Sequence, residues 1–228
     1  MDATLPQGQR MKIALLGAES TGKSELARAL CERLSQLALP VVRVDEHLRD
    51  WCQREQRTPE RDEQADIART QMLHVLQAPA QHVVVADTTP LMTAVYSQMV
   101  FNDHSLDASA IQWQQQFDIT LLTGLDLPWV ADGLQRDGAH VREPVDQKIR
   151  QLLSTANVRY QVVYGMGEQR LDNALFCIAR EAAKHPTELA QRLHQALARS
   201  ETQPKWTGPC ETCGDGECEH RLFTRLVT

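Results

Sequence analysis

The sequence lacks an apolar stretch of the roughly 18 residues that cross a bilayer. Residues 1–10 are polar and do not contain the apolar core of a signal peptide. Lys and Arg number 24 against 30 Asp and Glu, and the formal net charge of -6 gives no general attraction to nucleic acid or anionic lipid. We therefore expect a cytoplasmic protein with neither nucleic acid nor a membrane as a partner, and the oligomeric state stays open.

The chain also lacks repeats and long low-complexity tracts, and without an export signal its six cysteines are expected to stay reduced. What it does contain is an alternation of short apolar runs and helical patterns. Strands are predicted at residues 11–17, 41–44, 82–86, 117–122 and 161–164. Helices are predicted at residues 22–37, 46–54, 59–76, from about 90, and at 145–156, 167–184 and 187–199. This alternation indicates an α/β fold with a mostly parallel five-stranded sheet between helices.

Three parts are expected along the 228 residues. Residues 1–10 form a flexible N-terminus, residues 11–200 a single α/β domain, and residues 201–228 a small tail that contains Cys and His. The boundary is polar and contains two prolines, which is typical of a linker.

Residues 17–24 read GAESTGKS and match GxxxxGK[ST] in full, between a predicted strand and a predicted helix. Glycines let backbone N–H groups turn inward around phosphate oxygens, and the helix N-terminus faces the same anion. Lys23 would reach the β- and γ-phosphates, and the Ser24 hydroxyl would ligate Mg²⁺. The alternative is a glycine-rich turn that only caps a helix. We interpret the motif as the ATP site of a P-loop NTPase three-layer sandwich, with contacts from Gly17, Glu19, Ser20, Thr21, Gly22, Lys23, Ser24 and Leu26.

Two carboxylates follow predicted strands at the edge of the sheet where ligands bind. Asp87 stands where a Walker-B-type residue would complete the Mg²⁺ site, although aspartate there could instead cap a helix. Glu46 follows the second strand and could accept a proton from a substrate hydroxyl, or belong to an exposed first helical turn. Arg136, Arg142 and Arg150 lie in or after a Gly- and Asp-rich segment at 129–142 that we expect to be mobile. Arginines there could stabilise charge on a transferring phosphoryl group, or simply be solvated.

The chain resembles the ribosylnicotinamide kinase domain of NadR-type proteins, in the AAA-like P-loop family. The resemblance spans about residues 11–183 and rests on four stretches in order: GAESTGKSEL, EHLRDW, VVVADTTPLMT and DITLLTGLDLPWVADGLQRDG. It implies ATP-dependent phosphorylation of the 5′-hydroxyl of nicotinamide riboside to nicotinamide mononucleotide. It also implies ligand-side roles for Glu46, Arg49, Asp87, Trp129 and Asp132.

On this resemblance Asp87 is assigned to Mg²⁺ and Glu46 to the substrate. The Trp129 indole could stack on a cationic nicotinamide ring, or anchor its loop by partial burial. The chain departs from the NadR pattern in having no HxGH motif of a nucleotidyltransferase domain. Gln135 stands where the family has an arginine after WVADGL, so Arg136 is taken as the lid arginine.

The tail contains Cys210, Cys213, Cys218 and His220, three thiolates and an imidazole that could form a closed structural zinc site. The alternative is a tail with incidental or redox-active thiols. For the whole chain, two further functions stay open. One is a P-loop kinase for another nucleoside or vitamin-like alcohol, and the other is a nucleotide-dependent regulatory switch.

Overall fold

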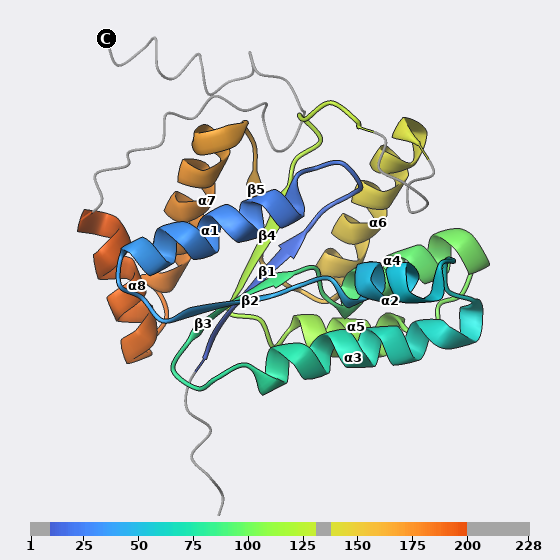
Figure 1. The fold of residues 1–228 in the computed structure, drawn as a ribbon, viewed down its shortest axis with the longest axis horizontal. Coiled ribbons are helices and arrows are strands. Elements are labelled where there is room, and N and C mark those ends of the chain that lie inside the picture. The colour runs from blue at the N-terminus through green and yellow to red at the C-terminus, as the bar shows by residue number, and fades with distance from the viewer. Residues whose placement is uncertain (1–9, 131–137, 200–228) are drawn as a thin grey trace, which may run out of the picture.

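The computed structural model describes residues 10–130 and 138–199. Its sheet has the strand order β2-β3-β1-β4-β5, and every neighbouring pair is parallel (Figure 1). The strands are β1 (Met11–Leu16), β2 (Val41–Val44), β3 (Val83–Asp87), β4 (Ile119–Thr123) and β5 (Gln161–Val163). The predicted fold class is confirmed, and the sheet is parallel throughout the described chain rather than mostly parallel.

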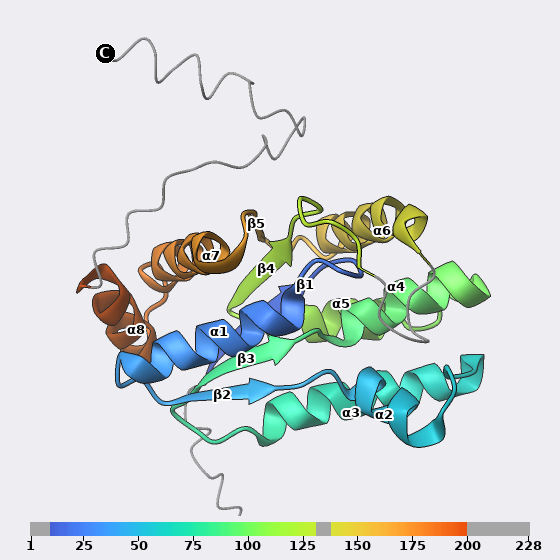
Figure 2. The same cartoon turned by 45° about the horizontal axis from the view of Figure 1, so that its top comes forward.

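Helices cover both faces of the sheet and complete a three-layer sandwich (Figure 2). One face carries α1 (Lys23–Gln36), α7 (Gly167–Ala182) and α8 (Glu188–Arg199). The other carries α3 (Gln64–Gln77), α4 (Pro90–Phe101), α5 (Asp107–Gln114) and α6 (Arg142–Thr155). The helix α2 (His47–Glu55) packs on α3, and two short 3-10 helices span Arg61–Glu63 and Ala139–Val141. Within the described residues no helix is both long and apolar enough to cross a membrane.

The central strand β1 shows why these elements assemble. Ile13 and Leu15 pack with α1, α7 and α8, whereas Ala14 and Leu16 face the helices of the opposite layer. Alternate side chains of a strand point to opposite faces, so a strand with consecutive apolar residues, such as residues 13–16 of β1, must be covered on both faces. The same rule explains why β3 and β4 are fully buried. The carboxyl ends of all five strands therefore open at one edge of the sheet, next to the start of α1.

Two parts of the chain differ from the sequence-based expectation. The helix α5 was not predicted, because it is short and polar and buries only Ala110 and Gln114. The segment expected to be mobile ends earlier than predicted, since Arg142 is the first residue of α6. Half of that segment, residues 131–137, lies outside the described residues.

Candidate active site

The P-loop motif forms the connection between β1 and α1. Gly17 has φ 152°, and a Cβ atom built on it would lie 2.0 Å from Thr123 Oγ1. Gly22 is the left-handed N-cap of α1 with φ 74°. Gly17 therefore requires glycine because of both space and conformation, whereas at position 22 the left-handed conformation favours glycine. The geometry agrees with the strand–loop–helix arrangement that the motif requires.

The end of β4 is fastened to this loop by hydroxyl groups. Thr123 Oγ1 lies 2.7 Å from Thr21 Oγ1 and 3.1 Å from the carbonyl oxygen of Leu16, and the Thr21 hydroxyl donates to the Ala18 carbonyl at 2.7 Å. Thr21 and Thr123 are both fully buried. Sequence reasoning missed Thr123, and the only signal for it was a hydroxyl at the end of a buried strand.

Lys23 and two carboxylates meet at the N-terminus of α1. Lys23 Nζ donates to the Ala18 carbonyl at 2.9 Å. Burial lowers the pKa of Lys23, and the negative charges of Glu46 and Asp87 oppose this shift. Burial likewise raises the pKa of Glu46, opposed by the positive charge of Lys23. The structure thus brings together Lys23, Glu46 and Asp87, although the first and the last of them are 64 positions apart in the sequence.

Asp87 ends β3 and is 3% exposed, and within the described chain its Oδ1 has no hydrogen-bond partner. The helix that follows is capped by Thr89, whose side chain accepts from the Leu91 amide at 3.3 Å. The capping role considered for Asp87 therefore belongs to Thr89. A buried carboxylate oxygen without a donor suits a divalent cation, because carboxylate and hydroxyl oxygens are what Mg²⁺ takes from a protein. Asp87 and Ser24 fit that role, and Thr88 beside them has a left-handed φ of 77°.

Glu46 is the N-cap residue of α2, and its side chain is 15% exposed. Arg49, one turn further on, contacts it through Nη2 at 3.4 Å. Glu46 is therefore not the solvated first-turn residue of the alternative interpretation. The negative charge of its side chain interacts with the positive charge of the P-loop residue Lys23.

The loop after β4 carries Trp129, which is half-buried. Its indole Nε1 is enclosed and has no hydrogen-bond partner within the described part of the chain. The next residue, Val130, is bonded to Ser20 of the P-loop. Two predicted site residues of this region, Asp132 and Arg136, lie outside the described residues, so their roles stay predictions.

The other two arginines considered for a lid are engaged in the fold. Arg142 is 8% exposed and donates to the Leu125 carbonyl at 3.2 Å. Arg150 pairs with Asp146 at 2.6 Å and lies 3.4 Å from the hydroxyl of Tyr160. Neither arginine is simply solvated, and both support α6 and its neighbours.

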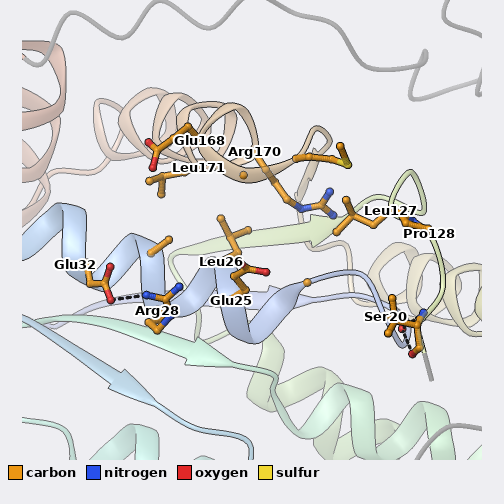
Figure 3. A pocket seen from close by; sticks show the side chains of 15 residues that line it. Ser20, Glu25, Leu26, Arg28, Glu32, Leu127, Pro128, Glu168, Arg170 and Leu171 are labelled. Carbon is orange, nitrogen blue, oxygen red and sulfur yellow. Dashed lines mark hydrogen bonds and ion pairs between the residues drawn. The ribbon is translucent and has the colours of Figure 1, made fainter. Parts of the chain in front are cut away.

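A cavity of about 790 Å³ opens beside the P-loop, between α1, the loop after β4 and the start of α7 (Figure 3). Its volume is within the range of small-molecule sites. Apolar side chains form much of its wall, among them Leu26, Leu127, Pro128, Met166 and Leu171. Leu26 was predicted to contact the nucleotide, whereas the residues after β4 and β5 were not. The cavity also includes Ser20 and Gly22, so a ligand in it would adjoin the P-loop.

A parallel sheet, a P-loop after its central strand and a buried aspartate on the next strand define a P-loop NTPase. The chain belongs to the AAA domain family, whose model matches residues 12–170. No curated protein matches the chain significantly.

Solved structures of NadR share this fold. A NadR complex with NAD and AMP-PNP superposes with a TM-score of 0.61 at 16% identity, covering 78% of this chain and 51% of NadR. A NadR complex with NR gives a TM-score of 0.55 at 14% identity, covering 86% of this chain and 51% of NadR. The chain thus spans about half the length of these NadR chains. The resemblance seen in the sequence is confirmed for the fold.

The four tail residues predicted to bind zinc, Cys210, Cys213, Cys218 and His220, lie outside the described residues. The boundary at residue 200 is likewise untested, although α8 ends at Arg199. Both stay predictions.

Proposed function

We propose that the chain is an ATP-dependent small-molecule kinase that phosphorylates the 5′-hydroxyl of nicotinamide riboside to give nicotinamide mononucleotide. The observation that carries this proposal is the convergence of Lys23, Glu46 and Asp87 at the P-loop, whose residues Ser20 and Gly22 also line a cavity large enough for a nucleoside. The fold shared with NadR, which was crystallised with AMP-PNP in one complex and NR in another, supports the choice of both substrates. The kinase domain would be residues 11–200.

The triphosphate of ATP would lie in the P-loop, where the N-terminus of α1 and Lys23 supply positive charge. Lys23 would then exchange its bond to the Ala18 carbonyl for the β- and γ-phosphates. The adenine base of ATP would occupy the cavity between Leu26, Leu127 and Met166, where apolar contact suits a flat ring.

Transfer needs the acceptor hydroxyl to lose its proton as its oxygen bonds to the γ-phosphorus and the bond from that phosphorus to the ADP oxygen breaks. Glu46 is the proposed acceptor of this proton, because burial raises its pKa towards that of a useful base. Asp87 and Ser24 would hold Mg²⁺, which neutralises charge on the phosphate oxygens when bound. The positive charge of Lys23 favours the ionised form of Glu46, which is the form that can accept this proton.

The acceptor would be held by Arg49 near Glu46, and by the indole of Trp129 stacked on the nicotinamide ring. Asp132 would contribute a further contact to the acceptor, and Arg136 would stabilise charge on the transferring group. The assignments of Arg49, Trp129 and Asp132 follow the NadR-like motifs of the sequence, whereas Arg136 stands one position after the arginine of the family pattern.

The test is ADP release coupled to a spectroscopic signal, with Mg²⁺ and ATP, against a panel of nucleosides and vitamin-like alcohols that includes nicotinamide riboside. We expect nicotinamide riboside to stimulate ADP release by the wild type strongly. In Lys23→Ala the stimulated rate should fall by at least about 10²-fold, because the lysine stabilises the transferred phosphoryl group. Lys184→Ala removes an exposed lysine just beyond the C-terminal end of α7 and serves as the control.

Each other outcome has a defined meaning. Stimulation by a different panel member would replace the acceptor and keep the kinase. Slow hydrolysis that no acceptor accelerates would contradict the kinase and favour a nucleotide-dependent switch. Full turnover in folded Lys23→Ala would remove the P-loop from the mechanism.

A further inference from the structure

Arg170 is a buried cation in the first turn of α7, and it is 4% exposed. Its Nη1 donates to Asp126 Oδ1 at 3.1 Å and to the Gly165 carbonyl at 2.7 Å. Its Nη2 donates to the carbonyls of Thr21 at 2.9 Å and Gly124 at 3.2 Å. The four N–H groups of the two terminal nitrogens are thereby all directed at acceptors.

The three carbonyls belong to loops that leave three neighbouring strands. Thr21 is in the P-loop after β1, Gly124 follows β4, and Gly165 follows β5. Each of these loops also supplies part of the cavity wall, through Gly22, Leu127 and Met166 respectively. Figure 3 shows the Arg170 side chain reaching from α7 towards the segment that carries Leu127. One guanidinium thus connects the three loops that contribute to the wall of the cavity.

Asp126 completes the arrangement from the opposite side. Its Oδ1 accepts from Arg170, and its Oδ2 accepts from the Gly165 amide at 2.6 Å. The carboxylate therefore joins the loop after β4 to the loop after β5 independently of the P-loop. Arg170 adds the connection to Thr21.

Burying a cation at this depth lowers the stability of the folded state. Burial lowers the pKa of Arg170, opposed by the charge of Asp126 and reinforced by that of nearby Arg142. Apolar side chains of similar volume often stabilise a buried site as well as an ion pair does. The bonds of Arg170 go mainly to loop carbonyls, so their distinctive effect is to fix the spacing of the loops.

We propose that Arg170 is a positioning residue for the nucleotide, which holds the P-loop at Thr21 in register with the two loops that wall the cavity. It acts through these backbone groups and not on the reacting atoms. The inference rests on the proposed binding of ATP at this site. A lysine presents three donors from a single point and cannot span the same carbonyls.

The experiment measures the Kd of a fluorescent ATP analogue and the melting temperature for wild type, Arg170→Lys, Arg170→Met and Asp126→Asn. We expect the Kd to rise about tenfold in Arg170→Lys, because one or two of the hydrogen bonds that hold the loops are lost. Arg170→Met should bind more weakly still, and Asp126→Asn should lie between wild type and Arg170→Lys. Arg33→Lys is the control, since Arg33 joins α1 to α7 through ion pairs with Glu168 at 2.8 Å and Asp172 at 3.8 Å.

A lower melting temperature with an unchanged Kd in Arg170→Lys would overturn the proposal and leave Arg170 a structural role only. If Arg170→Met fails to fold, Arg170→Lys and Asp126→Asn decide the outcome. A wild type that binds no nucleotide would overturn this inference together with the proposed function. A wild type that binds the analogue but phosphorylates no acceptor would overturn the kinase alone, because the readout here is nucleotide affinity.

Discussion

The hydroxyl of Ser20 bonds to both backbone groups of Val130, donating to the carbonyl at 2.7 Å and accepting from the amide at 3.0 Å. Ser20 belongs to the P-loop and has a left-handed φ of 55°, whereas Val130 follows Trp129. The P-loop is therefore joined directly to the loop that we propose for acceptor binding. A displacement of the P-loop backbone at Ser20 would shift Val130 and, through it, the adjacent Trp129.

Replacing Ser20 with alanine should remove its two hydrogen bonds to Val130. We expect the KM for the acceptor to rise by roughly three- to tenfold, since hydrogen bonds of about 0.5–1.5 kcal/mol no longer hold Trp129 in place. The melting temperature should change little, because the bonds are exposed. Steady-state kinetics with each substrate varied in turn measures the effect.

Ser109→Ala is the matched control for this variant, as its hydroxyl bonds to the Leu106 carbonyl at 3.0 Å within a surface helix. Identical kinetics in Ser20→Ala and wild type would show that the connection between the loops does not matter for acceptor binding.

The pH dependence of turnover should report the ionisation of Glu46. A base must be ionised, and burial raises the pKa of Glu46, so kcat should fall on acidification at a pH above the ordinary glutamate range. Glu46→Gln should lower kcat by about 10²–10⁴-fold, which is the usual contribution of a general base. A kcat–pH profile for both proteins measures this effect.

The same group predicts a pH-dependent difference in stability. A carboxyl with a raised folded-state pKa contributes most to the free energy of unfolding when the pH is below its ordinary pKa. This stabilising contribution is lost as the pH rises through the raised pKa. Glu46→Gln imitates the protonated form, so its melting temperature should exceed that of wild type near neutral pH and approach it in acid. Exposed Glu188→Gln is the control, and an offset that is constant with pH would contradict the assignment.

Trp129→Ala should weaken acceptor binding with little change in the affinity for ATP. The loss of a cation–π contact of about 1–2 kcal/mol would raise the acceptor KM roughly tenfold. Trp129→Phe should retain part of the effect because it keeps an aromatic face. Equal weakening for acceptor and ATP would instead indicate that Trp129 supports the structure.

Zinc is predicted at about one ion per chain, from the four ligands Cys210, Cys213, Cys218 and His220. Metal analysis of protein purified without metal-affinity resin tests this, and Cys213→Ser should lose most of the metal. Cys31→Ser is the control and should keep it, because burial raises the pKa of Cys31 to about 11 and the thiolate is scarce. Zinc-free wild-type protein would favour incidental thiols in the tail.

The amino-acid sequence determined the elements and the phosphate site. Apolar runs such as VVVA in β3 have to be buried on both faces, and the spacing of Leu26, Leu30 and Leu34 specifies a helix whatever lies beside it. The residues of the P-loop are contiguous, so a pattern in one segment is enough to find them. Asp87 was found for a related reason, as its place at the end of a buried strand fixes the edge of the sheet at which it lies.

The tertiary structure alone decided which distant groups meet. Nothing in the sequence near Arg170 distinguishes it from the solvated arginines of other helices, and its partners Thr21, Gly124 and Gly165 come from three separate strand ends. Thr123 and the Ser20–Val130 bonds were missed for the same reason. Local periodicity reflects the burial of one segment, whereas hydrogen bonds between loops depend on the order of strands β1, β4 and β5 in the sheet, and that order is set by the packing of the whole chain.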